Sequence, residues 1–129
     1  SQAVARRWIG QSRGGKIINI SSSGGFVGAL FPYRMTKWDI VGLTQGLGVA
    51  MSPKGIIVNG IAPGVTATPM MGRDQEQTDT NYYASHYPPS HRFALPEEIA
   101  ELALFLMSDA SNYIVGQTIV CDGGYCLKT

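Results

Sequence analysis

The chain has 129 residues, of which 44% are hydrophobic and 15% are charged, and its formal net charge is +1. These values are typical of a single soluble α/β domain, and they lack the basic surplus that favours nucleic acid as a partner. No apolar run reaches membrane-spanning length and no signal peptide is visible, so we expect a cytoplasmic protein with no membrane partner.

The cysteines and histidines do not suggest a metal site. Cys121 and Cys126 flank a short loop, and reduced thiols are a plainer expectation there than a disulfide. His86 and His91 lie in a polar stretch without a cluster of cysteines or carboxylates nearby. We therefore expect both histidines to be loop residues and the chain to bind no metal.

The first predicted strand leads into a candidate site. Residues 2–10 resemble the last turns of a helix, closed by a glycine. Residues 16–21 are short, rich in isoleucine and bounded by glycines and serines, as in a buried parallel strand. Ligand sites of parallel α/β sheets lie beyond the carboxyl ends of the strands. A serine hydroxyl at the end of this strand is therefore well placed for function, although serine- and glycine-rich turns are also common.

A predicted helix at about residues 32–52 carries a tyrosine and a lysine one helical turn apart near its start. Tyr33 and Lys37 are four residues apart and so share one helix face. A neighbouring ammonium favours the phenolate and is expected to lower the pKa of the tyrosine, which suits proton transfer. Alone, this spacing also fits an ordinary amphipathic helix. Gly42, Gly46 and Ala50 form a small-residue stripe that either admits another backbone or only weakens the helix.

Two more strands and one more helix complete the pattern. Residues 56–61 and 118–121 are the predicted strands, and a helix begins at Pro96 with an apolar stripe along one face. The alternation of strands and helices predicts a parallel sheet in the spatial order 16–21, 56–61, 118–121. Residues 70–95 show no clean period and are expected to form a substrate-binding loop. Its large side chains either line a pocket or only hold the loop to the body of the protein: Met70, Met71, Tyr82, Tyr83 and Tyr87.

Taken together, the segments resemble the C-terminal half of a short-chain dehydrogenase/reductase, and in particular members similar to 3-oxoacyl-(acyl carrier protein) reductases. The resemblance rests on the order and spacing of several motifs along nearly the whole chain: residues 15–22, Tyr33-x-x-x-Lys37, residues 58–64 with Thr68, residues 96–100, and Asp122-Gly123-Gly124. It implies one partial domain over residues 1–129, which is half of a Rossmann-like doubly wound parallel sheet. The N-terminal half would be absent.

The resemblance also implies a function and its residues. The protein would be an NAD(P)-dependent oxidoreductase that reduces a carbonyl or oxidises a secondary alcohol, with either NAD or NADP as its cofactor. Tyr33 would be the acid and base, and Ser22 would hold the substrate oxygen. Lys37 would assist Tyr33 and bind the nicotinamide ribose. The residues that border the nicotinamide would be Pro63, Gly64, Thr66 and Thr68, besides Tyr33 and Lys37.

Two departures from the family pattern qualify these roles. Ser22 precedes Tyr33 by 11 residues, whereas the serine of the family more often lies about 13 before its tyrosine, and Ser21 is the alternative. The glycine-rich first turn of the family would lie before Ser1, so we expect no G-x-x-x-G-x-G phosphate loop in this chain. The substrate class stays open among 3-oxoacyl thioesters, sugars, polyols and steroids.

The resemblance leaves two interpretations of the chain. In the first, it is the catalytic half of a homo-oligomeric enzyme, a dimer or tetramer, acting on a small carbonyl or alcohol substrate. In the second, it is a truncated, non-catalytic module that only binds another chain. In relatives the strand at residues 16–21 is central, so we expect either that another chain or segment covers its outer edge here or that the isolated chain aggregates.

Overall fold

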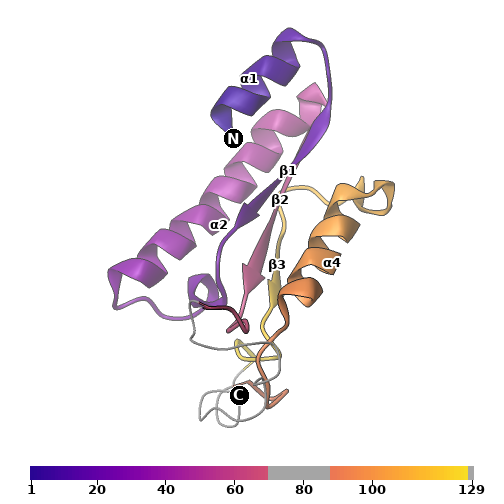
Figure 1. Ribbon diagram of the computed structural model, residues 1–129. Helices are drawn as coiled ribbons and strands as arrows, with labels where there is room; N and C mark the ends of the chain where they lie inside the picture. Colours follow the sequence, from indigo (N-terminus) through magenta and orange to yellow (C-terminus); the bar gives the residue numbers. More distant parts are fainter. Residues whose placement is uncertain (70–87, 128–129) are drawn as a thin grey trace.

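The computed structural model describes residues 1–69 and 88–127. Three parallel strands form one sheet: β1 (Gly15–Ile20), β2 (Ile56–Pro63) and β3 (Thr118–Cys121), in the order β1-β2-β3. The helices α1 (Gln2–Gly10) and α2 (Pro32–Met51) lie on one side of the sheet and α4 (Pro96–Met107) lies on the other (Figure 1). The predicted parallel sheet, its strand order and its fold class are confirmed.

Short 3-10 turns connect these elements. They are η1 (Ser23–Phe26) after β1, η2 (Ser52–Lys54) after α2 and η5 (Asp109–Ser111) after α4. Gly55 follows η2 with φ 71°, a left-handed conformation that glycine adopts without strain. The chain then enters β2, and Gly15 donates a backbone hydrogen bond to the carbonyl of Gly55 over 3.1 Å. This bond extends the β1–β2 ladder to the end of β1 opposite the site.

The core lies between the sheet and the α1–α2 layer. Ile56 and Val58 on β2 are fully buried and pack with Ala5 of α1. Trp8 of α1 and Leu47 of α2 are partly buried and pack against this cluster. Alternate residues of β2 point to this side, as the period of a strand requires. Burial of these apolar side chains therefore holds β1, β2 and the two helices together as one unit.

Polar side chains connect β2 to the chain before β3. The buried amide of Asn59 donates to the carbonyl of Ile114 over 2.7 Å and accepts the N–H of Gln117 over 3.0 Å. On β1, Lys16 donates to the backbone carbonyl of Ser108 and to the hydroxyl of Ser111. These bonds satisfy polar groups that would be costly to bury alone, and they fix the end of α4 against the sheet.

The glycines of α2 have different environments. A methyl group on Gly48 would lie 2.6 Å from the Cα of Gly116, so this glycine lets the helix approach the chain before β3. Methyl groups on Gly42 or Gly46 would meet nothing within 4 Å. Gly42, Gly46 and Gly48 have the G-x-x-x-G-x-G spacing of the family's phosphate loop. The three lie inside a helix and not at a strand-to-helix turn, so they do not form a phosphate loop.

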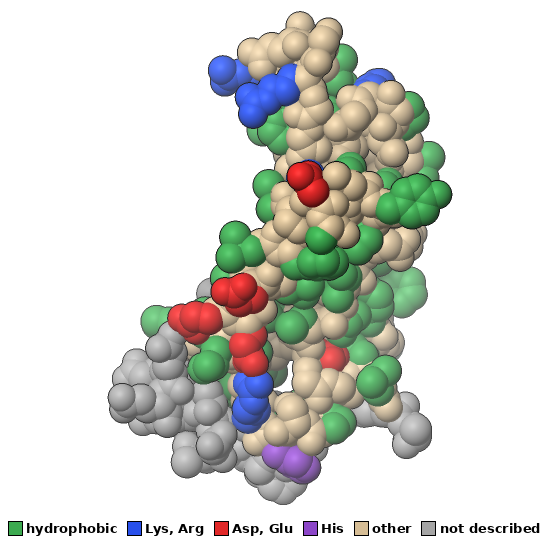
Figure 2. Space-filling view, turned by 90° about the vertical axis from the view of Figure 1, so that its right-hand side faces the viewer, with side chains coloured by type: hydrophobic (Ala, Val, Ile, Leu, Met, Phe, Trp, Pro, Cys, Tyr) green, Lys and Arg blue, Asp and Glu red, His purple; other side chains and the backbone are tan. Residues whose placement is uncertain are grey.

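Both outer surfaces expose large apolar side chains. On the α4 side, Leu104, Phe105, Met107 and Tyr113 are exposed, and hydrophobic side chains are visible across this view of the surface (Figure 2). Within the described parts of the chain, β1 pairs only with β2, so its other edge carries no strand. The prediction that another chain or segment covers that edge stays a prediction. No helix in the described ranges is long and apolar enough to cross a membrane.

Candidate active site

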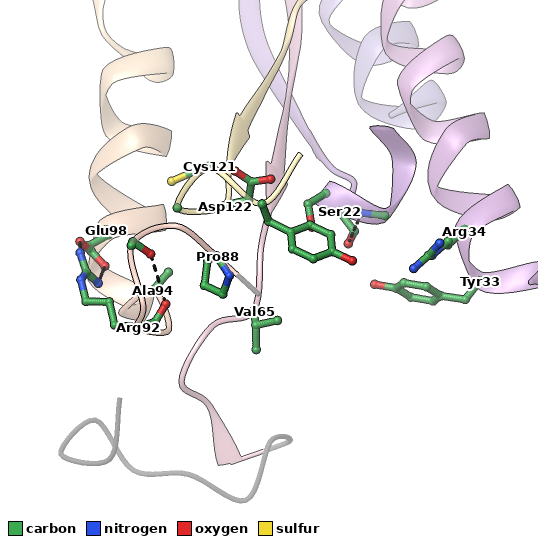
Figure 3. Close-up of a pocket in the computed structure, with 15 residues that line it drawn as sticks. Ser22, Tyr33, Arg34, Val65, Pro88, Arg92, Ala94, Glu98, Cys121 and Asp122 are labelled. Atoms are coloured by element: carbon green, nitrogen blue, oxygen red, sulfur yellow. Dashed lines mark hydrogen bonds and ion pairs between the residues drawn. The ribbon is translucent and has the colours of Figure 1, made fainter. Parts of the chain in front are cut away.

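A pocket of about 470 Å³ lies where the carboxyl ends of the three strands meet (Figure 3). Ser22, directly after β1, and Tyr33, in the first turn of α2, form one side of it. Residues after β2, after β3 and before α4 form the rest. The structure thus brings two of the three predicted catalytic residues to a single pocket.

The hydroxyl groups of Ser22 and Tyr33 retain their protons for a ligand. The Oγ atom of Ser22 accepts the N–H of Gly24 over 3.1 Å, as the side-chain cap of η1. Within residues 1–69 and 88–127, neither hydroxyl donates a hydrogen bond to the protein. Because each hydroxyl has one proton to donate, the pocket offers two unused O–H donors on one side.

Gly24 brings these groups close together. A methyl group placed on this glycine would lie 3.5 Å from the Oγ of Ser22, 3.7 Å from the Tyr33 ring and 3.5 Å from Cγ of Arg34. The serine, the tyrosine and the arginine stem therefore surround a single point of the backbone. A residue without a side chain leaves this space to the pocket.

Lys37 stands beside Tyr33, one helical turn further along α2. Its Nζ lies 5.7 Å from the centroid of the Tyr33 ring, and the side chain is half-buried. Among the described residues, Nζ donates no hydrogen bond, so its three N–H groups are available to a bound molecule. A ribose diol would fit this donor set, and the residues present therefore suit the nicotinamide-ribose end of a dinucleotide.

Ser21, the alternative serine, has a different environment. It is only 3% exposed, and its hydroxyl donates to the backbone carbonyl of Lys37 over 2.8 Å. Ser21 is not among the pocket-lining residues. Its hydroxyl instead fastens the end of β1 to α2, which holds Ser22 and Tyr33 in their relative positions.

The segment after β2 borders the pocket at one residue. Of residues 63–68, only Val65 lines the pocket. The predicted cofactor residues in this segment are not among the lining residues: Pro63, Gly64, Thr66 and Thr68. Ala94 donates to the carbonyl of Val65 over 3.0 Å, so this segment is paired with residues just before α4. The four predicted cofactor residues therefore belong to a segment that borders the pocket at Val65, but they do not line the pocket themselves.

The opposite wall contains an arginine–glutamate pair. Arg92 binds both carboxylate oxygens of Glu98 at 2.5 and 2.7 Å, and Glu98 also accepts the backbone N–H of Leu95 over 2.7 Å. These hydrogen bonds, with Arg92 as the largest cause, lower the pKa of Glu98 from 4.5 to about 2. The pair joins the residues before α4 to its first turn, and each charge is matched by the other.

The turn after β3 completes the pocket. The carboxylate of Asp122 accepts the backbone N–H groups of Gly124 and Cys126 at 2.9 and 2.8 Å. Gly123, with φ 64°, packs so closely on Ser90 that a methyl group would lie 2.3 Å from its Oγ. Cys121 is a free thiol whose pKa is raised, first by burial and then by the charges of Glu98 and Asp122.

Sequence reasoning missed the charged residues that line the pocket. Arg34, Arg92, Glu98 and Asp122 line the pocket, and none was a predicted site residue. A signal existed for Asp122, which follows a predicted parallel strand and so had to lie at the same edge as Ser22. The candidate pocket residues Met70, Met71, Tyr82, Tyr83 and Tyr87 fall outside the described residues, as does His86. Within residues 1–69 and 88–127, no three His, Cys, Asp or Glu residues cluster as potential metal ligands.

A parallel α/β sheet with a serine, a tyrosine and a lysine at its carboxyl edge defines a dehydrogenase-like class of protein. The family model described as enoyl-(acyl carrier protein) reductase matches residues 1–126. The chain therefore belongs to the short-chain dehydrogenase/reductase family, which is a family of oxidoreductases. This confirms the resemblance in the sequence.

Individual relatives agree with this assignment. The chain is 37% identical to the 3-oxoacyl-(acyl carrier protein) reductase of Aquifex aeolicus over 126 residues, which cover 96% of this chain and 50% of that protein. The solved acetoin dehydrogenase of Salmonella typhimurium is similar with a TM-score of 0.86 and 34% identity, over 99% of this chain and 51% of that one. A 4-hydroxyisoleucine dehydrogenase complexed with NADH has a TM-score of 0.85 at 28% identity, over 99% and 54%. The chain spans about half the length of the curated relatives it matches.

Proposed function

We propose that this chain is the catalytic half of an NAD(P)-dependent oxidoreductase that reduces a carbonyl to a secondary alcohol and catalyses the reverse reaction. The observation that carries the proposal is the pair of unused hydroxyl donors, Ser22 and Tyr33, on one side of a single pocket. Two O–H donors that converge on one oxygen stabilise the negative charge that develops there during reduction.

Each residue has a distinct role in this proposal. Ser22 donates a hydrogen bond to the substrate oxygen, and Tyr33 donates its proton to that oxygen as the alcohol forms. In the oxidation direction the Tyr33 phenolate takes the proton back. Ser22 is favoured over Ser21, because the Ser21 hydroxyl is buried and already donates to the Lys37 carbonyl. When bound, the nicotinamide supplies or accepts the hydride.

Lys37 and the chain after β2 would bind the cofactor. The ammonium of Lys37 has unused donors beside the Tyr33 ring, and it would bind the ribose and assist proton transfer at Tyr33. Pro63, Gly64, Thr66 and Thr68 would border the nicotinamide. A relative complexed with NADH supports a nicotinamide cofactor, and either NAD or NADP fits the residues present here.

The complete enzyme would include a glycine-rich half that binds the pyrophosphate, and it would be a cytoplasmic dimer or tetramer. The exposed apolar side chains of α2 and α4 support association with further copies. Val49 and Leu43 of α2 are 78% and 54% exposed. The same exposure supports the second candidate, a non-catalytic module that only binds another chain.

Replacement of Tyr33 in the complete enzyme tests the proposal. Tyr33→Phe deletes only the transferable proton, so we expect kcat to fall by about 10²–10⁴-fold while the Kd of the cofactor changes little. Lys37→Met should impair both quantities, because Lys37 serves the proton and the ribose. Tyr113→Phe is the matched control, since Tyr113 is fully exposed and lies outside the pocket. Near-normal kcat in Tyr33→Phe would refute the role of Tyr33, whereas the absence of turnover in the unmodified protein would favour the non-catalytic module.

A further inference from the structure

The charged side chains that line the pocket differ in their partners, and Arg34 has the weakest set of partners. Among the described residues, four charged side chains line the pocket: Arg34, Arg92, Glu98 and Asp122. Arg92 and Glu98 neutralise each other through two short hydrogen bonds. Asp122 accepts two backbone N–H groups. Among the residues that the structure describes, Arg34 has no acidic partner, and its Nη1 donates only to the neutral carbonyl of Gly28 over 2.9 Å.

Arg34 also lies next to the reacting groups. Its Cγ and the Ser22 hydroxyl are each 3.5 Å from the same point above Gly24, and the Tyr33 ring is 3.7 Å from it. Arg34 lies on the Tyr33 side of the pocket, whereas Asp122 lies on the other side with Cys121 (Figure 3). The Arg34 side chain therefore lies beside the proposed oxygen site, on the other side of the pocket from Asp122.

Helix stability does not explain this arginine. Arg34 is in the first turn of α2, where the helix dipole disfavours a cation, and that turn contains no acidic residue. Its side chain is half-buried, so part of its hydration is already lost. A guanidinium with unused N–H groups in such a place is suited to bind a planar anion through two parallel hydrogen bonds.

We propose that Arg34 binds a carboxylate of the substrate, so that the enzyme acts on oxo acids and the corresponding hydroxy acids. This inference rests on the function proposed above. It adds a substrate class to the same pocket, with the ketone oxygen at Ser22 and Tyr33 and the carboxylate at Arg34. An uncharged carbonyl compound of the same shape would leave the guanidinium without this partner.

The test uses matched acids and esters with the complete enzyme. Acetoacetate is compared with methyl acetoacetate, and 4-oxopentanoate with its methyl ester, so that two spacings between ketone and charge are sampled. We expect the unmodified enzyme to prefer at least one acid over its ester in kcat/KM. Arg34→Gln should lower that acid-to-ester ratio by about 10- to 100-fold, the effect of a lost charge-assisted hydrogen bond. Arg34→Lys should retain part of the preference, because it keeps the charge and loses the planar fork.

Several results would overturn the inference. An acid-to-ester ratio that is the same in the enzyme and in Arg34→Gln would show that Arg34 does not select the carboxylate, while turnover of the esters would leave the proposed function intact. A weaker Kd for NADPH in Arg34→Gln, with an unchanged ratio, would assign the arginine to the cofactor. If no ketone is turned over, the proposed function fails. Saturation-transfer NMR with pentanoate then tests the carboxylate site at Arg34 separately from catalysis. Pentanoate binding that does not depend on Arg34 would contradict the carboxylate site.

Discussion

Gly25 offers a sharp test of how the backbone positions the catalytic groups. It is buried in η1, and a methyl group on it would lie 2.8 Å from the carbonyl oxygen of Lys37 and 3.0 Å from the Oγ of Ser21. An ordinary carbon–oxygen contact is about 3.3–3.6 Å. Gly25→Ala therefore has to push η1 away from α2 by roughly 0.5 Å, or break the hydrogen bond between Ser21 and Lys37.

The expected cost follows from these distances. Overpacking of this kind destabilises a protein by about 1–3 kcal/mol. The same shift moves Ser22 away from Tyr33, and a misplacement approaching 1 Å costs up to about 100-fold in rate. We expect Gly25→Ala to lose stability within that range and to lower kcat/KM by about 10- to 100-fold. Urea unfolding and steady-state kinetics of the complete enzyme measure the two effects.

Two further variants distinguish the effect of the clash at Gly25 from the effects of a nearby methyl group and of the lost Ser21 hydrogen bond. Gly28→Ala is the control, because a methyl group there meets nothing within 4 Å and the change should stay within about 0.5 kcal/mol. Ser21→Ala removes the hydrogen bond without a clash and should cost about 1 kcal/mol. If Gly25→Ala unfolds and reacts like Gly28→Ala, the close contact between η1 and α2 does not hold the site together.

Three more measurements follow from the structure. The pKa of Glu98 is lowered to about 2 by Arg92 and the Leu95 N–H, so its contribution to stability is complete above pH 4.5 and is lost as the pH falls towards 2. Carboxyl-carbon NMR should show this titration. A Glu98 pKa near 4.5 in the protein with Arg92 intact would contradict the expectation. Gly46→Ala should raise the free energy of unfolding by about 1 kcal/mol, because its methyl group enters open space on a helix; a loss in urea unfolding would mean that another backbone packs there. Residues 1–129 alone should bind NADH and NADPH in the millimolar range or more weakly, because half a site gives few contacts; low-micromolar binding by titration calorimetry would refute this.

The strands and the reactive side of the pocket were predictable because their signals are local. The apolar run at Ile17, Ile18 and Ile20 defines β1 by itself, and the connection through a helix fixes its parallel pairing with β2. The four-residue spacing of Tyr33 and Lys37 likewise fixes their shared helix face. The prediction erred at the edges. β2 extends to Pro63 because Pro63 pairs with Cys121, a partner far away in the sequence.

The opposite wall could not be predicted because its contacts follow no regular spacing along the chain. The pairing of Arg92 with Glu98 crosses a loop-to-helix boundary, where no periodic spacing indicates which side chains meet. A glycine is needed at position 123 because Ser90 approaches it closely, and this contact is evident only in the folded structure. The unmatched charge of Arg34 is similar, since it becomes evident only when the partners of the other pocket charges are known.

The hydrogen bonds that join β1 to α2 and those that join the sheet to the chain between α4 and β3 have very different sequence separations, and this has a consequence for the order of assembly. Ser21 and Lys37 are 16 residues apart, whereas Asn59 and Ile114 are 55 apart and Lys16 and Ser111 are 95 apart. Closing a longer loop costs more entropy and delays the contacts that depend on it. During synthesis from the N-terminus, the β1–α2–β2 unit that contains Ser22, Tyr33 and Lys37 is complete before the wall that faces it has been made. The proton-transfer geometry is therefore expected to form first, and the wall that encloses the substrate to dock onto it afterwards.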